Sequence, residues 1–158
     1  MRPEASDMRL LMRCVTKLYE QCLENIRGEY GLSQIEIAII GFLYNNPGKD
    51  TAAEIVELRR LPKGNVSQGV ELLVKKGLVK RNADTTDRRK VHLFLEEAAI
   101  PICSGIEKVN QKFEEQLFAG LSGEEKEVYE RINRQLMENI EKGKIGRASC
   151  RERVSSPV

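Results

Sequence analysis

The sequence has little of what marks membrane, secreted and sheet-rich proteins. Aromatic residues make up 5% of the 158 residues, and there is no tryptophan. With 41% hydrophobic and 32% charged residues and few strand-forming runs, the composition is typical of a soluble, mostly helical protein. No apolar run approaches the roughly 18 residues of a membrane span, and residues 1–7 are too polar for a signal peptide. We therefore expect a cytoplasmic protein with no membrane partner.

The sequence also lacks the patterns that indicate disulfide, metal or catalytic chemistry. Cys14, Cys22, Cys103 and Cys150 form no C-x-x-C pair, so neither a disulfide framework nor a zinc site is indicated. There is no nucleophile and base set, no glycine-rich phosphate loop and no metal cluster. These absences argue against an enzyme and give no reason to expect a cofactor.

The formal net charge of +2 conceals opposite charges in different parts of the chain. Residues 59–92 contain 10 basic and 3 acidic side chains, a net charge of +7. Residues 1–58 and 93–142 carry −3 and −5, and residues 143–158 carry +3. A solvated surface is the common explanation of a basic run, but a basic block between two acidic flanks favours a nucleic-acid partner.

Capping boxes mark the starts of two consecutive helices in the middle of the chain. Ser33 followed by Glu36 predicts a helix whose apolar residues nearly encircle it, so this helix should be central. Turn-forming residues 45–48 end it, and Thr51 followed by Glu54 predicts a short third helix.

A fourth helix should follow, with Pro62 at its first position and Gly77 at its end. Its apolar residues recur at helical spacing and should face inward: Val66, Val70 and Leu73. The opposite face is polar and nearly bare: Gly64, Gln68, Glu71 and Lys75. A short helix followed by this one predicts a helix-turn-helix over residues 51–76, which places one helix in the DNA major groove.

Two short strands are predicted after the helix-turn-helix, over residues 78–82 and 91–95. In the second strand Val91, Leu93 and Leu95 should point inward, with His92 and Phe94 outward. The loop between them, residues 84–90, is basic, so the strands form a charged hairpin suited to lie beside the DNA backbone.

Long amphipathic helices are expected at both ends of the chain. Apolar stripes run along residues 8–26, ending near Gly28 or Gly31, along residues 102–117, and, after Ser122 and Glu125 cap a last helix, along residues 128–140. A small lobe cannot cover all these stripes, so the sequence favours a homodimer closed by two-fold symmetry. An intramolecular helix bundle is the alternative.

Three fragments in order, residues 72–81 (LLVKKGLVKR), 84–90 (DTTDRRK) and 91–95 (VHLFL), resemble the signature of the MarR family of bacterial winged-helix regulators. The resemblance covers residues 8–142. It implies a mainly α fold with a small β wing, in which a winged helix-turn-helix lobe (helix-turn-helix 51–76, wing 78–95) is joined to dimerisation helices 8–28 and 97–142. Residues 143–158 are predicted to be an unstructured or artefactual tail.

The resemblance implies a homodimer that binds double-stranded DNA at a palindromic operator. It also implies a repressor released by a small molecule or an oxidant. Glu96 and Ala99 replace the Thr and Gly usual in the family, and Pro101 falls early in the next helix. These departures question the start and straightness of that helix but leave the wing unaffected.

Ten residues are the candidates for DNA contact: Thr51, Lys63, Gly64, Asn65, Ser67, Gln68, Asp87, Arg88, Arg89 and Lys90. Asn65 and Gln68 can each offer a donor and an acceptor to an adenine edge, and Gly64 leaves room for close approach. Lys63, Ser67 and Thr51 suit phosphate contacts. A solvated helix face is the alternative.

On the wing, three consecutive cations suit the negative potential of a narrow minor groove. By match to the family's D-x-R motif, Arg89 is implied to enter that groove and Asp87 to orient the wing. His92 has no Cys, His or carboxylate partner at ligand spacing, so we predict an exposed strand residue near the DNA backbone rather than a pH switch or metal ligand.

Two other functions stay open at this point. Arg13 and Lys17 neighbour Cys14, so oxidation of Cys14 or Cys22 is a possible trigger for a thiol-based oxidant sensor. A protein-docking winged helix is disfavoured, because the outward face of the fourth helix lacks apolar anchors. An effector cavity in such a fold has possible walls in Tyr19, Tyr30, Ile35, Ile39 and Ile106, although residues at this spacing are more often core.

Overall fold

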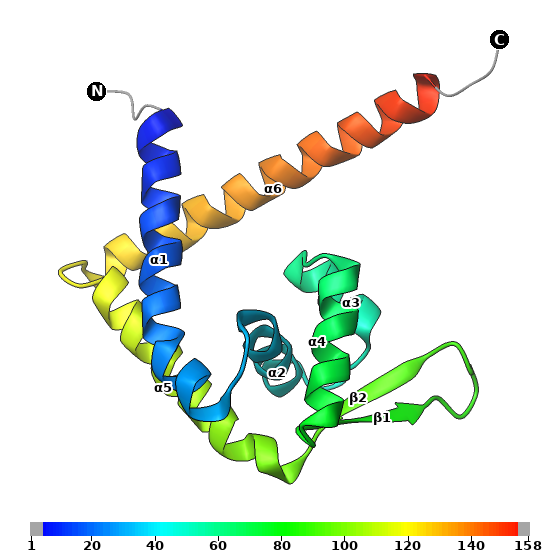
Figure 1. Ribbon diagram of the computed structural model, residues 1–158. Helices are drawn as coiled ribbons and strands as arrows, with labels where there is room; N and C mark the ends of the chain where they lie inside the picture. The colour runs from blue at the N-terminus through cyan, green and yellow to red at the C-terminus, as the bar shows by residue number, and fades with distance from the viewer. Residues whose placement is uncertain (1–4, 155–158) are drawn as a thin grey trace. The chain divides into compact units, whose positions relative to one another are not determined.

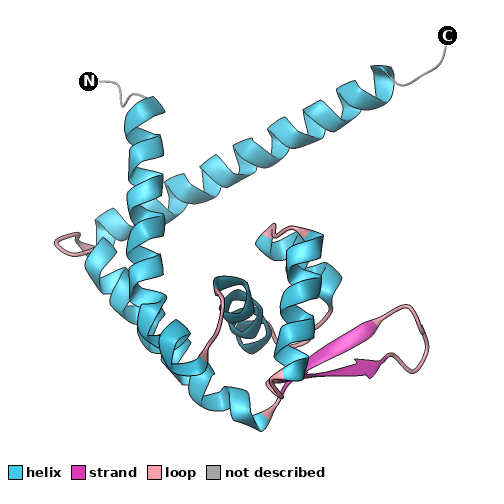
Figure 2. Ribbon diagram, in the orientation of Figure 1, coloured by secondary structure: helices cyan, strands magenta, loops and turns pink. Residues whose placement is uncertain are grey.

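The computed structural model describes the backbone of residues 5–154 and the side chains of residues 6–143. The elements in chain order are α1 (Ala5–Tyr30), α2 (Gln34–Asn45), α3 (Ala52–Arg59), α4 (Lys63–Lys75), β1 (Val79–Ala83), β2 (Val91–Leu95), the 3-10 turn η1 (Glu97–Ala99), α5 (Ile100–Leu117) and α6 (Gly123–Val154) (Figures 1 and 2). The predicted fold class, mainly α with a two-stranded wing, is confirmed. Among the described residues, those up to Leu117 form one compact unit and those from Phe118 form a second. Among the described residues, no helix combines the length and apolar character needed to cross a bilayer.

The predicted capping boxes start α2 and α3. Glu36 N–H donates to Ser33 Oγ (3.4 Å), and Ser33 N–H donates to Glu36 Oε2 (2.7 Å). The same reciprocal pair joins Thr51 and Glu54 at 3.3 and 3.0 Å. Each box satisfies backbone donors that a helix start otherwise leaves unpaired, so these two starts are fixed by local sequence.

The hydrophobic core of the first unit is formed by buried residues of α2 and α4 together with residues of α1, α3, α5 and the two strands. The inward residues of α4 are buried as predicted: Val66, Val70 and Leu73. Gly69, on the same face, was not predicted to matter. A Cβ atom there would lie 2.7 Å from Ile39 Cδ1 and 3.3 Å from Ile35 Cγ1, so only glycine lets α4 approach α2 this closely.

Helices α1 and α5 lie side by side (Figure 1). Leu23 and Ile26 of α1 are buried in the same cluster as Ile102 and Ile106 of α5. Further along, the rings of Tyr19 and Phe113 pack edge-on, with 5.1 Å between their centroids. The predicted stripe of α5 therefore packs within the unit.

Three predicted boundaries need correction. Pro62 is the residue before the first turn of α4, with φ −60° and ψ 133°, rather than the first helical residue. Strand β1 begins at Val79 and ends at Ala83, one residue later than predicted. The helix predicted from residue 97 begins at Ile100, after the 3-10 turn η1. Pro101 sits in the first turn of α5, where no intrahelical bond needs its missing N–H.

The second unit contains α6, which starts at the predicted Ser122 and Glu125 cap, with Ser122 N–H donating to Glu125 Oε2 at 2.8 Å. Its apolar stripe, Val128, Ile132, Leu136 and Ile140, is 40–51% exposed. The helical backbone continues to Val154, beyond residue 142, where the sequence predicted the pattern to end. The side chains of residues 144–154 and the whole of residues 155–158 lie outside the described part.

Candidate nucleic-acid interface

Five exposed residues lie in the N-terminal half of α4: Lys63, Gly64, Asn65, Ser67 and Gln68. Glu71, Leu72 and Lys75 are exposed further along the helix. Pro62 provides no side-chain cap, so the first N–H groups of the helix have no side-chain acceptor from that residue. A helix N-terminus carries partial positive charge, which favours a phosphate group nearby. A Cβ atom built on Gly64 would meet no neighbouring atom within 4 Å, consistent with close approach of another surface there.

Thr51 is less available than the α4 residues. It is half-buried, and its hydroxyl accepts from Glu54 N–H and donates to Glu54 Oε2 at 3.0 Å. The hydroxyl hydrogen is therefore used inside the capping box. A DNA phosphate, which can only accept, would have to compete with Glu54 for it.

The wing is an antiparallel hairpin that pairs Val79 with Leu95 at its base and Ala83 with Val91 at its outer end. The prediction that Val91 points inward is wrong: its side chain is 40% exposed. The hairpin extends past the lobe (Figure 2), so the alternation continues but the outer residues find no core beneath them. Leu93, nearer the base, is buried as predicted.

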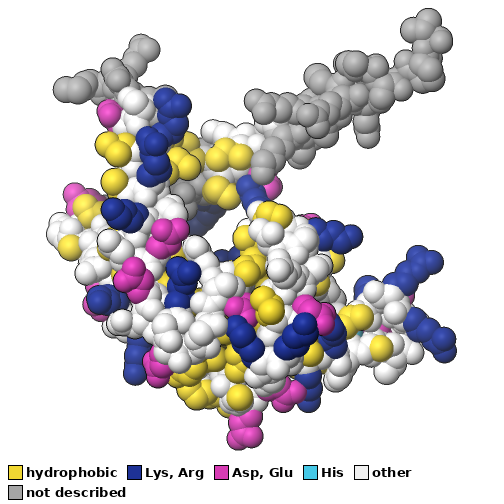
Figure 3. All heavy atoms as spheres, viewed as in Figure 1, with side chains coloured by type: hydrophobic (Ala, Val, Ile, Leu, Met, Phe, Trp, Pro, Cys, Tyr) yellow, Lys and Arg dark blue, Asp and Glu magenta, His cyan; other side chains and the backbone are white. Residues whose placement is uncertain are grey.

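Two aspartates shape the wing loop. Asp84 Oδ1 accepts from Thr86 N–H (3.1 Å), and Asp87 Oδ1 accepts from Arg89 N–H (3.0 Å). These side-chain turns fix the backbone on which the basic residues stand. Arg88, Arg89 and Lys90 are exposed, and Lys and Arg side chains project from the loop (Figure 3).

An ion pair joins the wing to α4. Arg81 Nη2 of β1 lies 2.7 Å from Glu71 Oε2 of α4, and Arg81 holds the pKa of Glu71 below its usual value. Sequence reasoning placed Glu71 on the bare outer face but did not find this partner. A second pair, Lys76 with the buried Glu36 at 2.7 Å, ties the end of α4 to the start of α2 and was also missed.

His92 corrects the sequence-based interpretation. His92 was predicted to be an exposed strand residue with no carboxylate at ligand spacing, but it is half-buried. Its Nδ1 lies 2.6 Å from Asp50 Oδ1 and its Nε2 lies 3.3 Å from Asp84 Oδ2. Asp50 precedes α3, and Asp84 opens the wing loop. The two partners are separated by 34 residues in sequence, so no local spacing could reveal the set.

The comparisons with known proteins agree with this geometry. Residues 30–90 match the model of the MarR family. This part of the chain is therefore similar to the MarR family. Solved MarR-type structures extend the likeness beyond residues 30–90. A MarR protein from Peptoclostridium difficile has a TM-score of 0.78 at 17% identity, over 90% of this chain and 93% of that one.

Two further similar structures are of proteins that bind DNA. MepR of S. aureus, in a complex with DNA, has a TM-score of 0.74 at 19% identity, over 87% of this chain and 99% of that one. Bordetella bronchiseptica BpsR, whose DNA binding is regulated by 6-hydroxynicotinic acid, has a TM-score of 0.68 at 17% identity, over 82% and 98%. At these identities the likeness establishes the MarR winged-helix fold.

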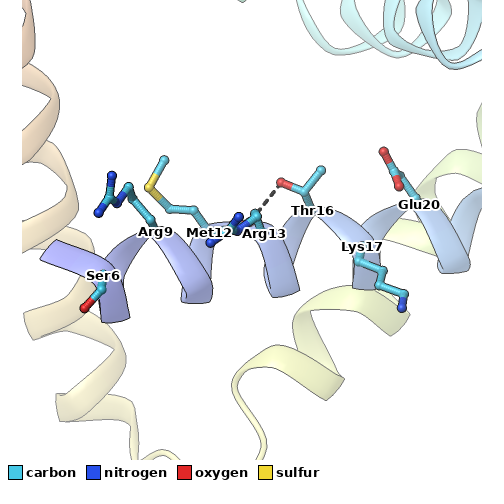
Figure 4. A pocket seen from close by; sticks show the side chains of 7 residues that line it. All are labelled: Ser6, Arg9, Met12, Arg13, Thr16, Lys17 and Glu20. Carbon is cyan, nitrogen blue, oxygen red and sulfur yellow. Dashed lines mark hydrogen bonds between the residues drawn. The ribbon is translucent and has the colours of Figure 1, made fainter. Parts of the chain in front are cut away.

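The five residues considered as effector-cavity walls belong to the packing of this MarR fold. Ile39 and Ile106 are buried in the hydrophobic core, and Tyr19, Tyr30 and Ile35 pack against it. A separate hollow of about 780 Å³ lies along α1 (Figure 4). The residues lining it are Ser6, Arg9, Met12, Arg13, Thr16, Lys17 and Glu20. All of these residues belong to α1, so one helix forms the described wall of the hollow. On that wall, Thr16 Oγ1 donates to the carbonyl of Met12 (2.9 Å).

The three cysteines within the described residues differ in access. Cys14 is exposed, Cys22 is half-buried with its Sγ 3.8 Å from Gln116 Oε1, and Cys103 is buried. Burial raises the pKa of the Cys103 thiol. A high thiol pKa disfavours the reactive thiolate, so Cys103 is the least suited of the three to sense an oxidant.

Proposed function

We propose that the protein is a sequence-specific, homodimeric transcriptional regulator that represses by binding palindromic operators and is released by a small molecule. The observation that carries the proposal is the pairing of a bare polar α4 N-terminus with a basic wing held to the same helix. Such a surface serves DNA because one element can read base edges while the other follows the backbone. A regulator of this kind acts in the cytoplasm, where bacterial DNA is.

Within this surface each residue has a proposed task. Asn65 and Gln68 read base edges, since amides can pair in two directions with adenine. Lys63 and Ser67 contact phosphates and set the register, with a weaker contribution from Thr51 because Glu54 engages its hydroxyl. Arg89 enters the minor groove, with Arg88 and Lys90 on the adjacent backbone, and Asp87 orients the loop by accepting from Arg89 N–H.

The proposal of a homodimer is supported by two exposed apolar stripes. Residues Val128, Ile132, Leu136 and Ile140 of α6, and Met8, Leu11 and Met12 of α1, are 40–61% exposed. Contiguous apolar surface of this kind marks an interface in a protein that stays in solution. A two-fold dimer presents two α4 helices to the two halves of a palindrome.

Release by a small molecule is supported by the fold shared with BpsR, whose DNA binding 6-hydroxynicotinic acid regulates. The ligand of the present protein is left open. A thermal-shift screen of small aromatic acids would identify candidates, because a ligand that binds only the folded state raises Tm.

The central test is selection of bound duplexes from a random DNA library, followed by anisotropy titration of the enriched sequence. We expect enrichment of a two-fold repeat, and a dimer by sedimentation velocity. Asn65→Ala together with Gln68→Ala should abolish the preference for that sequence but leave weak, salt-sensitive binding to any duplex. No enrichment by the wild type, or a sequence preference unchanged in the double variant, would refute this assignment.

A thiol-based oxidant sensor is the second candidate, favoured by the exposure of Cys14 beside Arg13 and Lys17. Oxidation would then release DNA in place of ligand binding. Peroxide should abolish operator binding of the wild type but not of Cys14→Ser with Cys22→Ser. Operator binding that survives peroxide in the wild type excludes this candidate.

A further inference from the structure

The imidazole of His92 lies between two carboxylates that belong to different parts of the lobe. Nδ1 is 2.6 Å from Asp50 Oδ1, and Nε2 is 3.3 Å from Asp84 Oδ2. The three side chains are only partly exposed, at 30% for His92, 25% for Asp50 and 21% for Asp84. The set is thus partly shielded from solvent.

Each carboxylate is attached to a different functional element. Asp50 stands directly before the N-cap of α3, and its carbonyl accepts from Leu93 N–H of β2 at 2.7 Å. Asp84 begins the wing loop, where its N–H donates to the carbonyl of Lys90 at 3.0 Å and its Oδ1 accepts from Thr86. His92 therefore connects the start of the helix-turn-helix to the loop that carries the basic residues.

The protonation state of His92 decides whether both connections can exist. A neutral imidazole has one N–H donor and one acceptor nitrogen, while the imidazolium has two donors. A carboxylate can only accept, so one of the two contacts is repulsive when the ring is neutral. Both contacts are favourable only in the charged form.

We propose that His92, as an imidazolium, is a positioning residue that clamps the wing loop to the helix-turn-helix in the orientation needed for DNA, and that loss of its proton loosens the wing. The effect of the clamp on DNA affinity rests on the DNA-binding function proposed above. The contacts of His92 with Asp50 and Asp84 do not depend on that function.

The two carboxylates that contact the ring both favour this state. From the loop before α3 the facing group is Asp50, and from the wing loop it is Asp84. On α3 the carboxylate of Glu54 accepts from Thr51 N–H and is also influenced by the charge of Lys49. Opposite His92 on β1 is Asn82, which does not titrate. Hydrogen bonds to Asp50 first, and to Asp84 second, raise the pKa of His92.

The direction of the pH effect follows from that raised pKa. A group whose pKa is higher in the clamped state contributes stability that is complete below its free pKa, about 6.5 for histidine, and is lost as pH rises through the clamped pKa. The wing should therefore be held below about pH 6.5 and released as the pH rises through the higher pKa of the clamped state. DNA affinity should fall over the same interval, because a mobile wing must be ordered on binding.

The clamp can be tested without DNA, because His92 is the only histidine of the chain. Its imidazole signals give an unambiguous NMR titration in the intact protein. Asp84→Asn should lower the midpoint of that titration by roughly half a pH unit or more, and Asp50→Asn should do the same. Glu71→Gln, which removes a carboxylate that Arg81 binds, is the charge-matched control and should leave the midpoint in place.

The functional arm compares operator binding of the wild type and His92→Gln at about pH 6 and about pH 8.5. The wild type should lose about three- to tenfold more affinity over this range than the variant, as expected for one coupled contact. Binding of DNA should in turn raise the midpoint of the His92 titration, because linkage is reciprocal.

Proximity of a DNA phosphate would also raise that midpoint, and Asp84→Asn separates the two causes. The clamp predicts a smaller DNA-induced rise in Asp84→Asn, whereas phosphate proximity predicts the same rise. An unchanged rise, or a free-protein midpoint that neither aspartate variant lowers, overturns the clamp. If no DNA sequence is bound at all, the proposed function fails, but the free-protein titration still decides whether the clamp exists.

Discussion

Helices α4 and α6 carry the same kind of apolar stripe but differ in what covers it. Val66, Val70 and Leu73 of α4 are 0–4% exposed, whereas Ile132 and Leu136 of α6 are 46% and 40% exposed. Helical spacing thus identifies the face that requires a partner, but it does not say whether the partner is in the same chain. For α4 that partner is α2; for α6 we propose a second copy.

The two helices also differ in charge. The lobe around α4 lies in a stretch of net charge +7, while residues 93–142, which contain most of α5 and α6, carry −5. An acidic region is repelled by DNA, and a basic one is drawn to it. Burial and charge together distinguish the region that we propose binds DNA from the region that we propose binds a second copy.

The largest effect should come from the buried stripe of α4. Leu73→Ala should lower the free energy of unfolding by about 2–5 kcal/mol, since Leu73 is fully buried and truncation leaves a cavity. Leu72→Ala is the matched control on the same helix. Leu72 is 37% exposed, and its truncation should cost clearly less in urea denaturation.

Leu136→Ala extends this comparison to α6. If its stripe is covered by a second copy, the loss of stability should depend on protein concentration, because association and folding are linked. The Leu73→Ala difference should be nearly independent of concentration. Equal losses in Leu72→Ala and Leu73→Ala, or no concentration dependence for Leu136→Ala, would contradict the distinction between the two stripes.

Much of this architecture follows from local sequence. The capping boxes at Ser33 and Thr51 specify helix starts, because the residues that satisfy the free N–H groups are three positions apart. The buried face of α4 follows from the helical spacing of its apolar residues, Val66, Val70 and Leu73. Boundaries such as Pro62 were missed by a single residue, since the same residue suits either side of a helix start.

The remainder depends on contacts between distant residues. No spacing rule joins His92 to Asp50, and the close packing of Gly69 against Ile39 exists only once α2 and α4 have met. Val91 was wrongly predicted to point inward. The alternation of side chains along a strand assigns each residue to a face but does not show where the core beneath that face ends. The ten candidate DNA contacts stay predictions of the same local kind, and the exposure of the α4 and wing residues is compatible with them.

The charge contrast is tested by Arg89→Ala. We expect a loss of about 1–3 kcal/mol in operator affinity, and a log–log salt slope reduced by about one contact. Anisotropy titrations at several salt concentrations measure both quantities. Lys112→Ala removes the same charge from an exposed position on α5, in the acidic part of the chain, and should change neither. Unchanged binding by Arg89→Ala, or an equal loss in Lys112→Ala, would remove the wing from the DNA interface.

The smallest effect on stability is expected from ion pairs. The pair of Lys76 with the buried Glu36 can be compared with the exposed pair of Arg81 with Glu71. Burial alone would raise the pKa of Glu36, but hydrogen bonds from Lys76 and Ser33 lower it below its usual value. A lowered carboxyl pKa contributes stability above the unfolded value of 4.5, and this contribution is lost as pH falls through the folded pKa. Lys76 is 35% exposed, so solvent screens the pair, and we expect about 1 kcal/mol.

Glu36→Gln isolates this charge, because glutamine can keep the capping box. In urea denaturation the variant should be less stable than the wild type at about pH 7, and the difference should shrink as the pH falls below about 4.5. Glu71→Gln breaks the exposed pair with Arg81 and should cost less at neutral pH. A Glu36→Gln difference that is the same at both pH values would mean that the side chain acts through its shape and hydrogen bonds rather than its charge.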